Sequence, residues 1–278
     1  MGTKVLVYCD AAGAGGGGVE AARAQAAALA RRLADEIIGL RGALAVRYLS
    51  VDDALDEALA VDDGTPAALA DRADNPGSGA PGDSTFVLRR LLERRVARSA
   101  LGPLWDAVAV RIAFEAGVGA RLEMRVGGKC GPASGAPLDL AVTVRALRRG
   151  MTMSGLDGTP LPVGDAAWLR VAGFATGGGA GGGAGGGAGD IDDGVDLVLI
   201  SQRRQAMGQD VFTNLGVDLA SRRLVVVKSA QHFVADFSRV CQRILYVGAP
   251  GAASPRLDEL PYTKIARPMW PLDENPWV

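Results

Sequence analysis

Histidine and cysteine are scarce in this chain of 278 residues. It has one histidine, His232, and three cysteines, Cys9, Cys130 and Cys241. A zinc site built from protein side chains usually needs two or three histidine or cysteine ligands, and these cysteines have neither a CxxC spacing nor a paired pattern. The sequence therefore shows no recognisable complete zinc site, and we predict no metal ligands on this chain alone. It also lacks a disulfide framework, which favours a reducing, cytoplasmic compartment.

Excess charge and long apolar runs are missing as well. The chain has 30 basic and 31 acidic residues and a formal net charge of -1, so no overall field attracts nucleic acid or an anionic membrane. No uncharged apolar run approaches the roughly 18 residues that cross a bilayer. The apolar run at residues 5–9 is too brief for the core of a signal peptide. We therefore predict a soluble protein with neither nucleic acid nor a membrane as a partner.

The beginning of the chain predicts a strand at residues 4–9, a glycine-rich turn at 13–18 and a helix at 20–40 with one apolar face. This order superficially resembles the opening of a dinucleotide-binding fold. However, "AAGAGGGG" is low in complexity, and no acidic residue ends a clear second strand at the expected distance. A packed strand-helix unit is the favoured interpretation, whereas measurable affinity for NAD or FAD would support the alternative.

The apolar patterning of the remaining chain predicts an α/β fold, with a mixed sheet flanked by helices. The predicted helices cover residues 50–59, 84–96, 210–215 and 230–243. The predicted strands cover residues 67–73, 120–126, 138–147, 168–174, 195–201, 224–228 and 244–247. The segment "TGGGAGGGAGGGAGD", residues 176–190, has no side chains with which to bury anything, so it is predicted to be a flexible insertion.

The segment "ADNPGSGAPGDST", residues 73–85, is the first candidate site. It connects a predicted strand to a predicted helix, and the free NH groups at a helix start can hold an anion. Asp74, Asn75, Asp83 and Ser84 can supply oxygen ligands or hydrogen bonds there. Alternatively, Asn75 begins a tight turn and Asp83 caps the helix. The local pattern favours neither interpretation.

The segment "RVGGK", residues 125–129, is the second candidate. Its paired glycines at a strand end let the backbone approach a ligand or another loop, with Lys129 just beyond them. A simple turn at the end of the sheet is the favoured interpretation here.

The segment "VVVKSAQHFVADF", residues 225–237, is the third candidate. Lys228 follows an apolar strand, and on the next helix His232 and Asp236 are four residues apart, where they can hydrogen-bond. A helix-surface pair without chemistry fits the spacing equally well. A Ser-His-Asp hydrolase that uses Ser84 or Ser229 is disfavoured because the chain has no GxSxG motif.

Four separated segments carry a resemblance to a known family. They are "DNPGSGAPGDST" at 74–85, "AGVGARLEMRVGGK" at 116–129, "VVVKSAQHFVADF" at 225–237 and "RPMWPLD" at 267–273. In this order and spacing they resemble the C-terminal domain of the microcystinase C (MlrC-type) family of zinc metallopeptidase-like proteins. Residues 1–45 resemble the last strand and helix of that family's N-terminal domain, and residues 46–278 resemble its C-terminal domain.

The resemblance implies a hydrolase family named for its part in degrading a cyanobacterial hepatotoxin peptide. In such proteins the zinc ligands belong chiefly to the N-terminal domain, and the C-terminal domain contributes loops to the cleft. The expected cofactor of the full-length family is therefore zinc, and the expected substrate is a peptide or small amide. The expected partner is a missing N-terminal zinc-binding domain or a second copy of this chain. A truncated chain, one half of a split protein and a degenerate paralogue all remain open.

Two hypotheses follow. In the first, the chain is the cleft-forming C-terminal domain of an MlrC-like metal-dependent peptidase or amidohydrolase, inactive without its zinc-binding partner, with Asp83 and His232 as catalytic residues. The predicted substrate-binding residues are Asp74, Asn75, Ser84, Lys129 and Lys228. In the second, the chain is a non-catalytic α/β module that binds a small anionic ligand or a protein partner.

Overall fold

The computed structural model describes residues 3–12, 18–171 and 194–273. The chain divides into two units, Met1–Arg47 and Tyr48–Val278, and each is described by itself. The predicted glycine-rich insertion at 176–190 lies outside the described residues. In the described part of the chain, no helix is long and apolar enough to cross a membrane.

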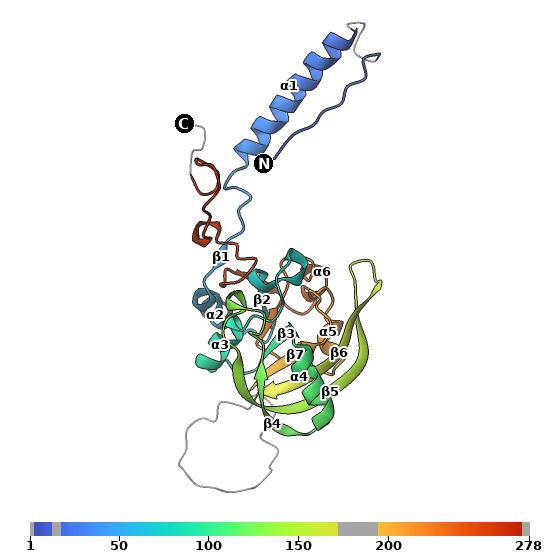
Figure 1. Cartoon of the computed structure of the whole chain (residues 1–278), viewed down its shortest axis with the longest axis vertical. Helices are drawn as coiled ribbons and strands as arrows, with labels where there is room; N and C mark the ends of the chain where they lie inside the picture. Colours follow the sequence, from blue (N-terminus) through green and yellow to red (C-terminus); the bar gives the residue numbers. More distant parts are fainter. Residues whose placement is uncertain (1–2, 13–17, 172–193, 274–278) are drawn as a thin grey trace. The chain divides into compact units, whose positions relative to one another are not determined.

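The first unit contains one long helix, α1 (Gly18–Gly39), coloured blue in Figure 1. Its sequence is rich in alanine, the residue that favours helices most, and Ala22 is its one buried residue. The strand predicted at residues 4–9 is wrong, because these residues pair with no strand. Apolar residues alone do not make a strand, since the backbone NH and carbonyl groups also need a neighbouring strand to bond with.

The second unit is built on one sheet, which has nine strands among the described residues, in the order β1-β9-β2-β8-β3-β7-β6-β5-β4. From β1 to β7 in this order neighbouring strands are parallel, and from β7 to β4 they are antiparallel. This arrangement confirms the predicted mixed sheet. The strands are β1 (Tyr48–Leu49), β2 (Ala67–Asp71), β3 (Ser99–Trp105), β4 (Arg121–Val126), β5 (Leu138–Ser154), β6 (Pro160–Val171), β7 (Val195–Ile200), β8 (Leu224–Val227) and β9 (Arg243–Val247).

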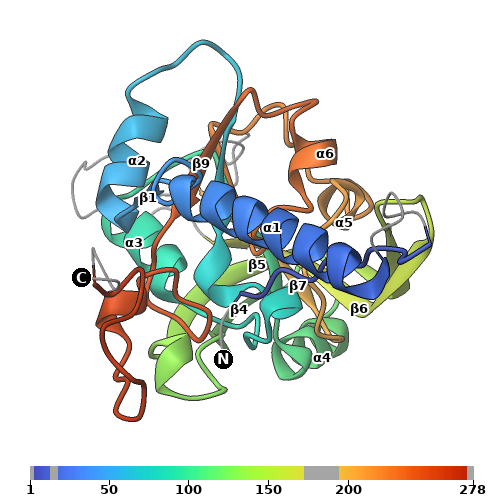
Figure 2. The same cartoon turned by 90° about the horizontal axis from the view of Figure 1, so that it is seen from above.

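Helices cover both faces of this sheet. The helices α2 (Val51–Leu59), α3 (Phe86–Glu93) and α4 (Ala107–Ala116) share one buried apolar cluster with Ala67 and Leu69 of β2. The helices α5 (Asp210–Thr213) and α6 (Val234–Phe237) share the other cluster with Ala68 and Ala70. Successive residues of a strand point to opposite faces, so β2 is buried on both sides. Figure 2 shows α2 and α3 on the side of the sheet away from α5 and α6.

The sequence did not predict β3 or α4. The pair Gly102 and Pro103 interrupts the apolar run of β3, and proline is rare in a central strand. The sheet accommodates Pro103 because the register of β3 against β7 shifts between Leu101 and Leu104. Gly102 is needed there, since a Cβ atom would lie 2.9 Å from Cβ of Val198.

Several predicted boundaries need correction. The strand predicted at 168–174 coincides over residues 168–171 with the end of the longer β6, and its last residues lie outside the described part of the chain. The helix predicted at 84–96 is the shorter α3, which begins two residues later and ends three residues earlier. The helix predicted at 230–243 reduces to the single turn of α6, because its backbone bonds alternate between three- and four-residue steps. Phe233 and Phe237 are nevertheless fully buried.

Candidate functional site

The candidate site lies where the parallel strands β2, β8 and β3 end. Because these strands are parallel neighbours, the loops that follow them meet at the same edge of the sheet. In open α/β sheets, ligands bind beyond this edge. The segments that meet here include residues 72–85 after β2 and residues 228–233 after β8. The first and third candidate segments therefore lie together, and Asp83 joins the second, residues 125–129, to the first.

Lys228 is the centre of this edge, and it is fully buried. Its Nζ donates to Asp74 Oδ2 at 2.7 Å, to Asp71 Oδ2 at 3.1 Å and to the carbonyl oxygen of Ser84 at 2.9 Å. A lysine ammonium has three donors, so all three are already used within the chain. Burial alone would lower the pKa of Lys228, but the charges and hydrogen bonds of Asp71 and Asp74 outweigh it and raise the pKa above 10.5.

Asp74 organises the loop after β2. Its Oδ1 accepts from the backbone NH of Gly82 at 2.8 Å, and its Oδ2 accepts from the NH of Ser84 at 2.7 Å as well as from Lys228. The carboxylate is 1% exposed. The Pro/Gly-rich loop therefore wraps around the buried Asp74–Lys228 pair, which explains why the chain devotes so many turn residues to this junction.

Asp71 belongs to the same cluster and was missed from the sequence as a site residue. It is 1% exposed, and its Oδ1 is the one oxygen of the cluster that has no hydrogen-bond partner among the described residues. Burial raises the pKa of Asp71, Asp74 adds to this effect, and Lys228 opposes it. The sequence signal was that Asp71 and Lys228 each stand at the end of an apolar strand. Only the structure shows that the two ends are neighbours, because Ala70 of β2 is in register with Val227 of β8.

The NH groups that lead into α3 bond within the chain. The NH of Ser84 donates to Asp74, the NH of Thr85 donates to the carbonyl oxygen of Ser134 at 2.9 Å, and the NH of Phe86 donates to Ser84 Oγ at 3.5 Å. Ser84 itself is 1% exposed, and the next residues of the helix, Val87 and Leu88, are fully buried. These three NH groups are therefore engaged within the chain.

Asp83 joins the loop after β2 to the loop between β4 and β5. Its Oδ2 accepts from the NH groups of Lys129 at 2.7 Å and Cys130 at 2.9 Å, and its Oδ1 accepts from the hydroxyl of Ser134. Gly127 lets the two loops approach, since a Cβ atom there would lie 2.7 Å from the carbonyl oxygen of Asp83. Gly128 packs against the end of its own loop, where a Cβ atom would lie 2.6 Å from the backbone nitrogen of Pro137. The paired glycines thus allow a close approach to another loop, which the sequence offered beside an approach to a ligand, and they do more than form a turn at the end of the sheet.

Lys129 and Cys130 have limited chemistry in this setting. Lys129 Nζ donates to Asp106 Oδ2 at 2.5 Å and to the carbonyl oxygen of Arg125 at 3.0 Å. Its side chain is 32% exposed, so one end of this ion pair reaches solvent. Burial and the neighbouring Asp83 raise the pKa of the Cys130 thiol to about 11. This thiol is therefore protonated at neutral pH and is neither a ready nucleophile nor a ready metal ligand.

His232 lies at the surface of the candidate site. Gln205 Nε2 donates to His232 Nδ1 at 2.7 Å, which assigns the ring proton to Nε2 in the neutral form. Gln205 also contacts the loop tip, because a Cβ atom on Gly77 would lie 1.6 Å from its Oε1. Asn75 holds this tip by accepting from the NH of Gly77 at 3.0 Å and donating to Ser78 Oγ at 3.1 Å.

The predicted hydrogen bond between His232 and Asp236 is not formed. Asp236 Oδ2 accepts instead from the NH of Gln209 at 2.7 Å, and His232 precedes the short α6. Tyr246 OH donates at 3.0 Å to Oε1 of Gln231, the residue before His232, and the Tyr246 and Tyr48 rings meet edge to face. His232, Gln205, the tip at residues 75–79 and these tyrosines form what we term the rim.

The predicted site residues thus separate into two groups. His232 and Lys129 are exposed. The other five are 4% exposed or less, and their polar groups are directed to partners within the chain. These five are Asp74, Asn75, Asp83, Ser84 and Lys228. Their predicted roles in binding or catalysis remain predictions.

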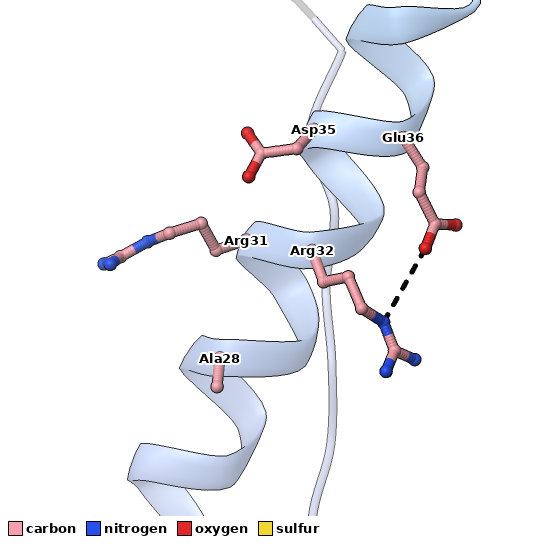
Figure 3. A pocket seen from close by; sticks show the side chains of 5 residues that line it. All are labelled: Ala28, Arg31, Arg32, Asp35 and Glu36. Atoms are coloured by element: carbon pink, nitrogen blue, oxygen red, sulfur yellow. Dashed lines mark ion pairs between the residues drawn. The ribbon is translucent and has the colours of Figure 1, made fainter.

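A shallow hollow along α1 in the first unit is lined by side chains of that helix, shown in Figure 3. Arg32 and Glu36 form an ion pair at 3.7 Å with both side chains largely exposed, and Arg31 and Asp35 extend to the other side of the helix. Two basic and two acidic side chains balance in charge, and exposed pairs of this kind contribute little. This hollow has the character of a solvated helix face.

Comparisons with known proteins decide the family. The family described as "MlrC C-terminus" matches residues 69–264. The chain belongs to this family. It is 33% identical over 273 residues to Microcystinase C of a Sphingomonas species, covering 98% of this chain and 47% of that protein.

The solved structure of a "Putative metallopeptidase" from Mesorhizobium sp. BNC1 is also similar, at 29% identity and a TM-score of 0.69. The match covers 94% of this MlrC-type chain and 46% of that one. The chain therefore spans about half the length of the relatives it matches.

Proposed function

We propose that this chain is the cleft-forming C-terminal half of an MlrC-like metal-dependent peptidase or amidohydrolase, and that it acts on a peptide or small amide together with a zinc-binding N-terminal domain. Family membership and the names of the two relatives support the hydrolase class. The observation that carries the proposal is the rim, because it places an exposed imidazole and a loop tip at the edge of the sheet where α/β proteins bind ligands. A cytoplasmic location remains a prediction.

The residues of this chain do not fit a complete zinc site. No group of three or more histidine, cysteine, aspartate or glutamate side chains within the described ranges is placed to hold a metal ion. Burial raises the pKa of Cys241 to about 12 and contributes to the raised pKa of Cys130, and zinc binds the thiolate form of cysteine. We therefore assign zinc to the N-terminal domain and derive no step of the reaction through it.

His232 is the residue of this chain that we assign to substrate contact. Its Nδ1 accepts from Gln205, so the neutral ring carries a proton on Nε2. This NH can donate to a substrate carbonyl oxygen or to the negative charge that develops on it, and a donor of this kind stabilises the transition state of amide hydrolysis. Gln205 orients the ring, and it is held in turn against the loop tip at Gly77.

Asp74, Asp83 and Lys228 support this arrangement as positioning residues. Asp74 and Lys228 fix the loop after β2 from inside the protein, and Asp83 fixes the neighbouring loop at Lys129 and Cys130. Direct catalysis by Asp83 would require its oxygens to leave three donors. We therefore propose that Asp83 holds the geometry of the loops and is not the catalytic residue that the sequence predicted.

The first unit supplies a surface for a partner. Four large apolar side chains in this unit are at least 37% exposed. They are Val19, Ile37 and Ile38 of α1 and Leu40 directly after it. Ile37, Ile38 and Leu40 lie close together in sequence at the end of the helix, and exposed apolar residues that cluster favour contact with another protein surface. We propose that this surface packs against the N-terminal zinc-binding domain, and that in its absence it supports self-association.

A complementation experiment tests the proposal. The chain is co-expressed with the N-terminal half of a full-length MlrC-type relative, and zinc-dependent hydrolysis of a small peptide library is measured with and without a chelator. We expect activity only when both halves are present. His232→Gln should lower kcat strongly at unchanged complex formation, whereas Arg111→Gln, an exposed change on α4, should have no effect.

Two results would count against this function. A failure of the two halves to associate would contradict the proposed partner. Full activity of the His232→Gln complex would remove His232 from the reaction, while leaving the partner assignment intact.

The second candidate function is that of a non-catalytic module that binds a protein. The exposed apolar residues of α1 favour it, since they do not depend on any reaction. If the complex with the N-terminal half forms and holds zinc but hydrolyses no peptide or amide, this second function is favoured.

A further inference from the structure

A basic pocket lies at the opposite edge of the sheet from the candidate site. It is a cavity of about 330 Å³ where β3 and β8 begin, between the end of α2 and the turn after α3. Its lining contains four arginines and a single carboxylate, Asp62, among the described residues. The arginines are Arg94, Arg95, Arg98 and Arg223.

The charges of these arginines are unequally matched. Arg94 pairs with Asp56 at 2.5 Å and with Asp52 at 3.3 Å, so its charge is balanced nearby. Arg98 donates to the carbonyl oxygen of Ser221 at 3.1 Å, and Arg223 donates to that of Leu59 at 2.6 Å. A carbonyl satisfies a donor without cancelling a charge.

Arg95 has no side-chain hydrogen bond or ion pair among the described residues, and it is exposed. Three guanidinium groups therefore face one carboxylate, Asp62. The lining therefore carries an excess of positive charge, which suits an anionic ligand. A phosphate ester carries about -1.5 to -2 at neutral pH.

One unsatisfied group lies at this pocket. The Nε atom of Arg223 is buried without a hydrogen-bond partner among the residues that the structure describes, and a buried donor without a hydrogen bond costs free energy. The φ of 53° at Arg95 has a local cause, because the NH groups of Arg95 and Val96 close the end of α3 on the carbonyl oxygens of Leu92 and Leu91. The case for a ligand therefore depends on the charges of the lining and on the unpaired side chain of Arg95.

We propose that this pocket binds a small phosphorylated molecule, with Arg95, Arg98 and Arg223 as ligands of the phosphate group. The planar guanidinium fork matches phosphate oxygens in pairs. The volume lies at the low end for small-molecule sites, which leaves room for a phosphate and a short organic group but not for a large cofactor. The site is separate from the rim and does not depend on peptidase activity.

Isothermal titration of the full chain with inorganic phosphate and with glycerol 3-phosphate tests this assignment, at constant ionic strength in a buffer without other oxyanions. We expect saturable binding of both, with the ester at least as tight as inorganic phosphate. Arg95→Gln should raise the Kd for either anion by roughly tenfold, the equivalent of losing one charge-assisted contact. Arg95 has no side-chain partner within the described chain, so this variant should fold like the wild type, which circular dichroism checks.

Arg111→Gln is the matched control, because it removes a charge on α4 whose side chain is 73% exposed. Its Kd should equal that of the wild type. Three outcomes would overturn the proposal: no saturation with either anion at millimolar concentration, an unchanged Kd for Arg95→Gln, or an equal loss for Arg111→Gln. Weaker binding of the ester than of inorganic phosphate would refute a phosphorylated molecule as the ligand.

Discussion

Replacement of Lys228 by methionine tests the account of the buried cluster most directly. Methionine has a similar length and removes the ammonium, so Asp71 and Asp74 are left buried beside each other, 1% exposed each. Removing one partner of a buried ion pair typically costs roughly 3–5 kcal/mol. That is a large share of the free energy of unfolding of a typical domain, about 5–15 kcal/mol. Urea unfolding followed by circular dichroism measures the change.

Asp71→Asn should behave very differently, although it changes the same cluster. Two carboxylates face one ammonium, so the substitution removes the surplus negative charge. Asp71 Oδ1 has no partner among the described residues, and the asparagine can keep its carbonyl oxygen on Lys228. We therefore expect a change of about 1 kcal/mol or less in the free energy of unfolding, in either direction. Arg125→Met, which breaks an exposed pair with Asp139, is the control and should cause no measurable loss.

The pH dependence of stability gives an independent check. The folded-state pKa of Lys228 is raised above its ordinary value of 10.5. The native state therefore holds this proton more tightly than the unfolded state, and the resulting stability is present below pH 10.5 and is lost as the pH rises through the folded-state pKa. Lys228→Met should lack this alkaline loss. Equal costs for Lys228→Met and Asp71→Asn, or identical alkaline curves for wild type and Lys228→Met, would refute the reasoning.

Three further predictions concern the loops around Asp83. Alkylation of Cys130 by iodoacetamide, followed by mass spectrometry, should be slow at pH 7 and rise towards pH 11, since its pKa is raised to about 11; fast reaction at neutral pH would contradict this. Asp83→Ala should cost roughly 3 kcal/mol or more, because three donors lose a charged acceptor. Hydrogen exchange at the amides of Lys129 and Cys130 should accelerate in that variant, and unchanged protection would argue against the loop-holding role. Gly128→Ala should lower the free energy of unfolding in urea more than Gly150→Ala. Both glycines have a positive φ, in which an alanine costs about 1–2 kcal/mol. Only at Gly128 would the added Cβ atom meet backbone atoms within 3 Å. Equal losses would show that the close approach is unimportant.

The sequence was a good guide wherever structure follows from local patterning. The apolar runs that became β2, β7 and β8 are buried on both faces, and the apolar patterning indicated an α/β fold that the structure confirms. Family membership could also be inferred from the sequence, because each of the four motifs is a continuous stretch of residues that can be recognised without knowledge of the fold. The pattern was misleading at residues 4–9 and at 230–243, where apolar spacing fits a strand or a helix but the hydrogen-bond partners differ from those expected.

The candidate site depended on the tertiary structure. Asp74, Asp83 and Lys228 were singled out from their sequence context, but the partners of Lys228 lie 144 to 157 residues away along the chain. Which oxygens and NH groups meet is set by the order and register of β2, β8 and β3. These pairings are non-local, since they follow from the packing of the whole sheet.

For the same reason, the sequence showed that His232 is the single imidazole, whereas the structure showed that Gln205, and not Asp236, orients it. Local periodicity determines which side of an element is buried. Only the packed sheet decides which charged groups share the buried space, because a charge removed from water must find its partner wherever the fold brings one.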